Sequence, residues 1–97
     1  MRNAKEEVLE KVNISDILCA EIRCKGNTIL LKKGGDVIQF LNSLDFEYDA
    51  GYGGQELYGT VWLKDCKTWL ERGEYDGAEW WNIKKLPNIP KKLSSGE

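Results

Sequence analysis

Ninety-seven residues are enough chain for one domain, because a second would have too few residues to enclose its own core. The composition is 41% hydrophobic and 31% charged, which is typical of a folded globular domain rather than a disordered chain. A net charge of -2 argues against direct nucleic-acid binding, and the absence of histidine excludes a Ser-His-Asp triad, a Cys-His pair and an imidazole zinc site within this sequence.

The first half of the sequence predicts a helix, a β-hairpin and a second helix. Apolar residues recur at helical spacing at both ends of this half, and they alternate in strand fashion between them. Gly34-Gly35 ends the hairpin, and Asp36 is placed to cap the second helix. In chain order, we expect these elements at residues 3–12, 17–24, 28–32 and 36–44.

After a glycine-rich irregular segment at residues 45–55, the second half predicts a three-stranded meander. We expect its strands at residues 56–63, 68–75 and 78–85, joined by Lys64–Lys67 and by the Asp76-Gly77 turn. The whole is predicted as a single α+β domain over residues 1–90, in the order αββα followed by a three-stranded antiparallel meander. Residues 91–97 are predicted as a flexible C-terminal tail.

The predicted turns fix the register of the meander: they pair Trp62 with Trp69, Gly59 with Arg72, and Arg72 with Trp81. This register decides the composition of the two faces. One face carries four large aromatic residues: Tyr58, Trp62, Trp69 and Trp80. The other carries apolar residues followed by Arg72 opposite Trp81, with Gly59 leaving room beside them, and then Glu74 and Glu79. Either one helix covers each face or the first hairpin folds over the second, or one face stays open as an interface.

Arg72 has two interpretations. Its guanidinium can stack on Trp81 and pair with a neighbouring carboxylate, which would hold the sheet together. Alternatively, Arg72 and Trp81 are solvent-accessible and contact a partner or ligand, because Tyr, Trp and Arg are frequent anchors of interfaces. On the second interpretation, the predicted binding residues are Asp49, Tyr52, Arg72, Glu74, Asp76, Glu79 and Trp81.

No cofactor, metal or catalytic constellation is predicted, and we expect the protein not to be an enzyme. The three cysteines are read as free thiols of a reduced, cytoplasmic protein, with a redox or metal role as the alternative. The acidic segments 45–56 and 71–79 match no EF-hand spacing, and Gly51-Tyr52-Gly53-Gly54 is neither a Walker loop nor a dinucleotide fingerprint. No secretory signal or membrane-spanning segment is expected.

Two stretches of the sequence carry a resemblance to known proteins. They are Tyr48-Asp49-Ala50-Gly51-Tyr52-Gly53-Gly54-Gln55-Glu56-Leu57 and Trp69-Leu70-Glu71-Arg72-Gly73-Glu74-Tyr75-Asp76-Gly77-Ala78-Glu79-Trp80-Trp81. Both resemble small proteins encoded by bacteriophages and prophages. The resemblance covers roughly residues 44–90. The sequence departs from that pattern at Lys64–Lys67, where a tighter Asp-Gly turn would be expected. The resemblance implies a small protein made in the cytosol of an infected or lysogenic bacterium, and it brings no activity with it.

The leading hypothesis is therefore a protein–protein interaction module, whose partner would be a bacterial host or defence protein that it inhibits. A homodimer is possible. The alternative is a protein that binds or sequesters a nucleotide-like ligand between Tyr52, Arg72 and Trp81. A third idea is that the acidic segments occupy a basic groove meant for nucleic acid.

Overall fold

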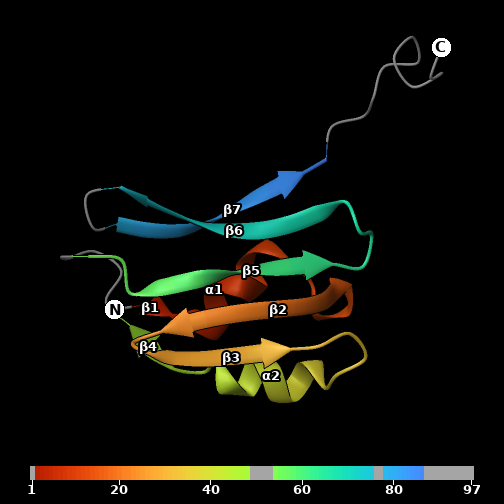
Figure 1. The fold of residues 1–97 in the computed structure, drawn as a ribbon, viewed down its shortest axis with the longest axis horizontal. Coiled ribbons are helices and arrows are strands. Elements are labelled where there is room, and N and C mark those ends of the chain that lie inside the picture. Colours follow the sequence, from red (N-terminus) through yellow and green to blue (C-terminus); the bar gives the residue numbers. More distant parts are fainter. Residues whose placement is uncertain (1, 49–53, 76–77, 87–97) are drawn as a thin grey trace, which may run out of the picture.

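The computed structural model describes residues 2–48, 54–75 and 78–86 (Figure 1). Two α-helices and a mostly antiparallel sheet make this an α+β fold. The elements in chain order are β1 (Arg2–Asn3), α1 (Ala4–Lys11), the 3-10 turn η1 (Ile14–Asp16), β2 (Ile17–Cys24), β3 (Asn27–Leu31), α2 (Val37–Ser43), β4 (Glu47–Tyr48), β5 (Leu57–Leu63), β6 (Thr68–Tyr75) and β7 (Ala78–Lys85). The short elements β1, η1 and β4 are additions to the predicted order. The predicted Asp76-Gly77 turn and the predicted tail at 91–97 lie outside the described residues.

A single five-stranded antiparallel sheet contains both the predicted hairpin and the predicted meander, in the order β3-β2-β5-β6-β7. The joint is the pairing of β2 with β5, which places Ala20 opposite Val61. The registers of Trp62 with Trp69 and of Arg72 with Trp81 are as predicted. The predicted pairing of Gly59 with Arg72 is wrong, because β5 and β6 pair only from Thr60–Glu71 to Trp62–Trp69.

The turn between β5 and β6 is held by Asp65. Its carboxylate accepts hydrogen bonds from the Lys67 and Thr68 amides, at 2.9 and 2.8 Å, and from the Thr68 hydroxyl at 2.6 Å. These hydrogen bonds lower the pKa of Asp65 below its usual value, and the one from the Thr68 hydroxyl has the largest effect. An aspartate that closes its own turn explains why Lys64–Lys67 sets the predicted register without the Asp-Gly turn.

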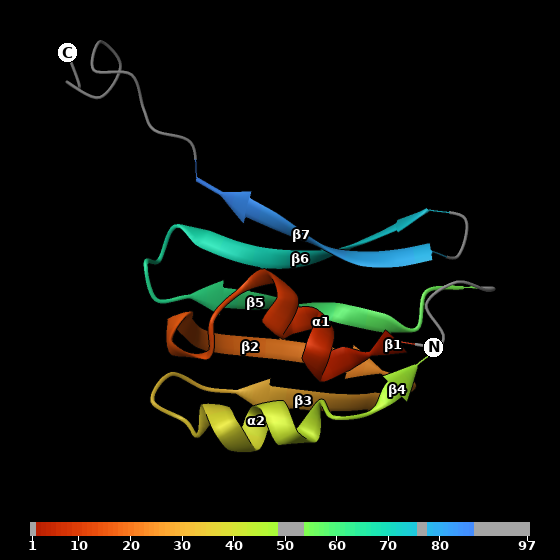
Figure 2. The ribbon, with the colours of Figure 1, turned by 180° about the vertical axis from the view of Figure 1, so that it is seen from behind.

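Helix α1 lies over one face of the sheet, which is seen from that side in Figure 2, and α2 lies beside the edge strand β3. The buried residues of both helices belong to one core on that face. Asn3 and Asp36 cap the helices, each accepting a hydrogen bond of 3.0 Å from a first-turn amide. The start of α1 is also tied to the segment before β4, because the Ala4 and Lys5 amides each donate to a backbone carbonyl there at 2.9 Å. A core that both helices share on one face contradicts the interpretation in which each face has its own helix.

The core lies between the helices and the covered face of the sheet. It joins helix residues such as Val8 and Leu41 to inward-facing strand residues such as Ile22, Val61 and Leu70. The strand residues that alternate with these, including Leu30, Tyr58 and Trp62, are exposed on the other face. The fold therefore leaves one face of the sheet without a helix over it among the described residues. None of the helices in the described part of the chain is long and apolar enough to cross a bilayer.

Candidate functional site

Three of the predicted binding residues form a buried cluster on the covered face. The Arg72 guanidinium carbon lies 4.8 Å from the centroid of the Trp81 ring, and an Arg72 Nη2 donates to Glu79 Oε1 at 2.8 Å. The side chains of Arg72 and Glu79 are 3% and 0% exposed, and Trp81 is 3% exposed. The predicted stacking is confirmed, whereas the predicted solvent access is wrong, because this face of the sheet packs into the core.

Arg72 and Glu79 hold β5 where it has separated from β6. Arg72 Nε donates to the Leu57 carbonyl at 3.2 Å. The Glu79 carboxylate accepts from the amides of Glu56 and Leu57, at 2.6 and 3.0 Å. Because buried backbone groups need partners, these two side chains replace the ladder that the separated strands no longer form.

Gly59 also acts differently from its prediction. It has a φ of +148°, and a Cβ added there would lie 2.2 Å from the Glu21 carbonyl oxygen and 2.9 Å from Ile22 Cα. The missing side chain therefore makes room for the backbone of β2 and not for the stack of Arg72 on Trp81. Glycine is required here because β2 and β5 approach each other this closely.

A chain of polar contacts links this cluster to α1. Arg72 Nη2 also donates to the Tyr48 hydroxyl at 2.8 Å, and that hydroxyl in turn donates to the Glu7 carboxylate. Burial, followed by the hydrogen bond to Glu7, raises the pKa of Tyr48 far above its ordinary value. Glu7 is buried in spite of its charge and pairs with Arg2 Nε at 3.0 Å. The sequence analysis did not identify Glu7 and Tyr48 as members of this cluster. The helical spacing of apolar residues in α1 does not indicate which of its glutamates is buried.

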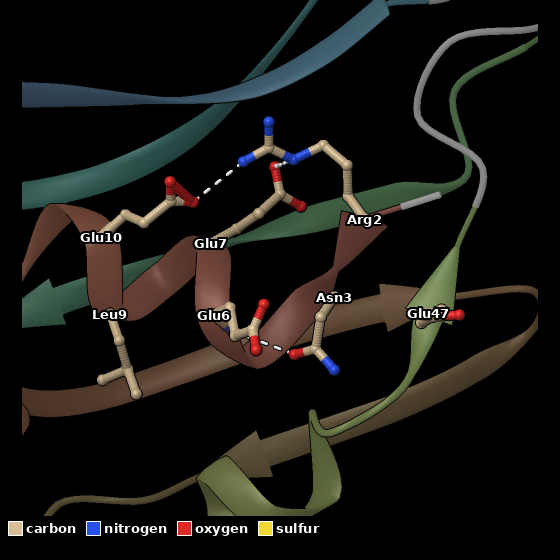
Figure 3. A pocket seen from close by; sticks show the side chains of 7 residues that line it. All are labelled: Arg2, Asn3, Glu6, Glu7, Leu9, Glu10 and Glu47. Atoms are coloured by element: carbon tan, nitrogen blue, oxygen red, sulfur yellow. Dashed lines mark hydrogen bonds and ion pairs between the residues drawn. The ribbon is translucent and has the colours of Figure 1, made fainter.

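Figure 3 shows the hollow beside this end of α1, where Arg2 lies between the carboxylates of Glu7 and Glu10. It has a volume of about 640 Å³ and is lined by Arg2, Asn3, Glu6, Glu7, Leu9, Glu10 and Glu47. Within residues 2–48, 54–75 and 78–86, no group of three or more His, Cys, Asp or Glu side chains is placed to hold a metal ion. Two of the carboxylates in this hollow, those of Glu7 and Glu10, pair with Arg2.

Of the other predicted binding residues, the structure describes Glu74. Glu74 is exposed at the end of β6, opposite Glu79 in the register. Asp49, Tyr52 and Asp76 lie outside the described residues. Among the predicted binding residues that the structure describes, Arg72, Glu79 and Trp81 are brought together in the buried cluster.

The open face of the sheet carries the aromatic residues that the register places together. We call Tyr58, Trp62, Trp69 and Trp80 the aromatic face; the first, second and fourth are 44%, 42% and 39% exposed, and Trp69 is half-buried. They come from β5, β6 and β7, the three strands at one side of the sheet in Figure 1. Sequence reasoning identified the composition of this face but assigned the binding residues to the opposite one.

Neighbours on the same face fix the rings of the aromatic face. Trp69 Nε1 donates to Glu71 Oε1 at 2.9 Å, and Trp80 Nε1 donates to Asn82 Oδ1 at 3.0 Å. The Arg23 guanidinium carbon lies 5.9 Å from the centroid of the Tyr58 ring. Rings that are already held in place lose little conformational freedom when they bind.

Gly73 provides the surface on which the Trp80 ring lies. A Cβ added at Gly73 would meet Trp80 Nε1 at 2.7 Å and Cε2 at 2.8 Å, so the indole occupies the space that a side chain on β6 would take. Trp80 and Gly73 are cross-strand partners. Close packing of a ring over a glycine on the neighbouring strand is a further reason why Trp80 has a defined position.

A hollow of about 380 Å³ lies at one end of the aromatic face. Its lining is mainly apolar, and Lys33 is its one charged residue. The lining residues are Leu18, Cys19, Lys33, Trp62, Leu63, Cys66, Thr68 and Trp69. Such a hollow suits a planar apolar group that carries a negative charge.

The three cysteines are free thiols, as predicted. Cys66 is exposed and Cys19 half-buried, and both line the hollow on the open side. Cys24 is buried on the covered side, and this burial raises the pKa of its thiol.

Comparison of the sequence with protein-family models and curated proteins, and of the fold with solved structures, gives no match.

Proposed function

We propose that this protein is a non-enzymatic binding module that holds a protein partner on the aromatic face. The observation that carries the proposal is the set of partly exposed indole and phenol rings, held by hydrogen bonds and packing on a sheet face that no described helix covers. Trp and Tyr dominate the binding energy of many protein interfaces, and large exposed aromatic surface is uncommon on a monomeric protein without such a role.

The partner that we propose is a protein of a bacterial host, including its defence machinery, which the module would inhibit by occupying one of its surfaces. This assignment depends on the resemblance of residues 48–57 and 69–81 to phage and prophage proteins. The buried Arg72, Glu79 and Trp81 are not part of the contact surface in this proposal; they hold β5 against the last hairpin.

The experiment is affinity capture from bacterial cytosol with the immobilised chain, followed by mass spectrometry. A Trp62→Ala, Trp80→Ala double variant should lose at least about tenfold of the captured partner, because each substitution removes an interface anchor worth roughly 1–3 kcal/mol. Ile38→Ala is the matched control, since Ile38 is 54% exposed but lies on α2, which flanks the edge strand β3. Equal capture by the double variant, with its fold intact by circular dichroism, would contradict the proposal.

The hollow beside Trp62 and Trp69 favours a second candidate function, the binding of a nucleotide-like anion. Its base would stack on an indole, and Lys33 would face its phosphate. Such a ligand should raise the unfolding midpoint of the wild type by mass action, and Lys33→Gln should reduce that shift. If no nucleotide changes the midpoint, this second candidate is excluded and the protein-binding proposal is unaffected.

A further inference from the structure

The two edges of the five-stranded sheet differ in how they are protected. Helix α2 lies alongside the edge strand β3, as Figures 1 and 2 both show. On the other side, no strand among the described residues pairs with the outer edge of β7. The eight-residue β7 is long for an unpaired edge, and such an edge is a template for another strand.

The backbone of β7 shows which of its groups point outward. The Leu86 amide donates to the Lys67 carbonyl at 2.9 Å, so Lys67 and Leu86 form a hydrogen-bonded pair that continues the ladder between β6 and β7. Because hydrogen-bonded and non-hydrogen-bonded pairs alternate in an antiparallel ladder, the N–H and C=O groups of Trp81, Ile83 and Lys85 point away from β6. They are available to a strand that adds at this edge.

Large apolar side chains are exposed beside the same edge. Trp80, Ile83 and Leu86 are 39%, 55% and 52% exposed, and all of them lie on β7 or directly after it. Exposed apolar residues next to unpaired backbone are the combination that a paired strand would bury.

We propose that two copies of this chain pair antiparallel through β7, about a two-fold axis at Asn82. In this register Ile83 faces Trp81 of the second copy on the helix side, and Lys84 faces Trp80 of the second copy on the open side. In an antiparallel ladder, residues directly opposite each other on the two strands point to the same face of the sheet, as both of these pairs do.

The charges of β7 favour this arrangement over shifted ones. The strand begins beside the exposed carboxylate of Glu74 and ends in Lys84 and Lys85, whereas the Glu79 carboxylate is buried and already paired with Arg72. Antiparallel pairing brings the acidic end of one copy to the basic end of the other. A register centred on Lys84 would instead place the two Lys84 side chains against each other, which is unfavourable.

This inference is independent of the proposed protein partner. The paired sheets would be continuous across the axis, with both cores on one side and both aromatic faces on the other. The dimer would therefore extend the open surface and leave it accessible.

The mass in solution tests the proposal, since each chain has a mass of 11.1 kDa. Sedimentation equilibrium should give twice this mass for the wild type and the single mass for Ile83→Pro. Proline removes an outward N–H of β7 and leaves the ladder to β6 intact. Ile83→Thr keeps the N–H and should still dimerise. A single-chain mass for the wild type at the highest attainable concentration would overturn the proposal, as would a dimer that survives Ile83→Pro.

A second measurement fixes the register and does not depend on the folding of the proline variant. At the axis, the two Asn82 residues form a non-hydrogen-bonded pair with Cα atoms about 4.5 Å apart, within disulfide range. Asn82→Cys, in a Cys19→Ser, Cys66→Ser background, should therefore form an intermolecular disulfide when oxidised glutathione is added. In the Lys84→Cys variant, the cysteines of the two copies would lie four residues out of register, which is roughly 13 Å along the strands. Their disulfide should therefore form far more slowly. Equal rates for the two variants would overturn the register.

Discussion

At the level of single residues, Arg72 and Glu79 stabilise the fold, although arginine is a residue type that often anchors interfaces. Arg72 contacts Leu57, Tyr48, Glu79 and Trp81, while one nitrogen of its guanidinium, Nη1, has no hydrogen-bond partner among the residues that the structure describes. A buried ion pair of this kind adds little net stability over an apolar replacement, but removal of one partner leaves an uncompensated charge. The pair is therefore sensitive to single substitutions.

Glu79→Gln should lower the free energy of unfolding by about 3 kcal/mol, because it leaves the Arg72 guanidinium without its buried counter-charge. Urea denaturation followed by tryptophan fluorescence measures this difference. Glu21→Gln removes the same charge from an exposed position on β2 and should change the stability by less than about 0.5 kcal/mol. Equal effects of the two substitutions would show that Glu79 is not part of a buried pair.

Tyr48 gives the protein an alkaline sensitivity whose sign follows from its pKa. The pKa of Tyr48 is raised in the folded state above the ordinary value of 10.0, so the folded state holds this proton more tightly than the unfolded state does. The stabilisation is complete below about pH 10 and is lost progressively as the pH rises above that value.

The free energy of unfolding of the wild type, measured between pH 8 and pH 11.5, should therefore fall more steeply above about pH 10 than that of Tyr48→Phe. The phenylalanine variant should be less stable at pH 8, because Arg72 and Glu7 lose the hydroxyl between them. Parallel pH profiles for the two proteins would contradict the burial of this hydroxyl.

At the level of elements, the local signals in the sequence were sufficient for the two helices, for the strands of both hairpins and for the registers of Trp62 with Trp69 and of Arg72 with Trp81. The short strands β1 and β4 have two residues each, too few for any periodicity, and they form only because they pair with each other. The pairing of β2 with β5 joins segments about 40 residues apart, so no local pattern specifies it. The loss of pairing between β5 and β6 beyond Glu71 also depends on distant contacts, those of Glu79 with the backbone of β5.

The junction of β2 with β5 makes Gly59→Ala a test at this scale. The Cβ would lie 2.2 Å from the Glu21 oxygen, and the φ of +148° is unfavourable for alanine. Backbone strain alone costs about 1–3 kcal/mol, and the displacement of β2 adds to it. Gly54→Ala is the control, because a Cβ there has no atom within 4 Å. Similar urea midpoints for the two variants would show that β2 does not approach β5 at Gly59.

At the level of the whole molecule, α1 lies over one face of the sheet, α2 flanks the edge strand β3, and the aromatic face lies on the opposite side of the sheet from the core that both helices share. The alternation of residues predicted what each face carries, including the stack of Arg72 on Trp81. It did not predict which face is covered, because both faces carry large apolar residues and only the packing of α1 and α2 decides between them. The predicted binding residues were therefore placed on the covered face, and the open one was left unassigned.

Solvent reaches the aromatic face, whereas Trp81 is buried on the covered face of the sheet. The most direct test is the NMR spectrum of the 15N-labelled chain, in which each of the four tryptophans gives one indole N–H signal, recorded with and without a soluble gadolinium chelate. We predict that the chelate strongly broadens the signals of Trp62 and Trp80, broadens that of Trp69 less, and leaves that of Trp81 sharp. Broadening of the Trp81 signal as strong as that of Trp62, or protection of Trp62 and Trp80, would contradict the account.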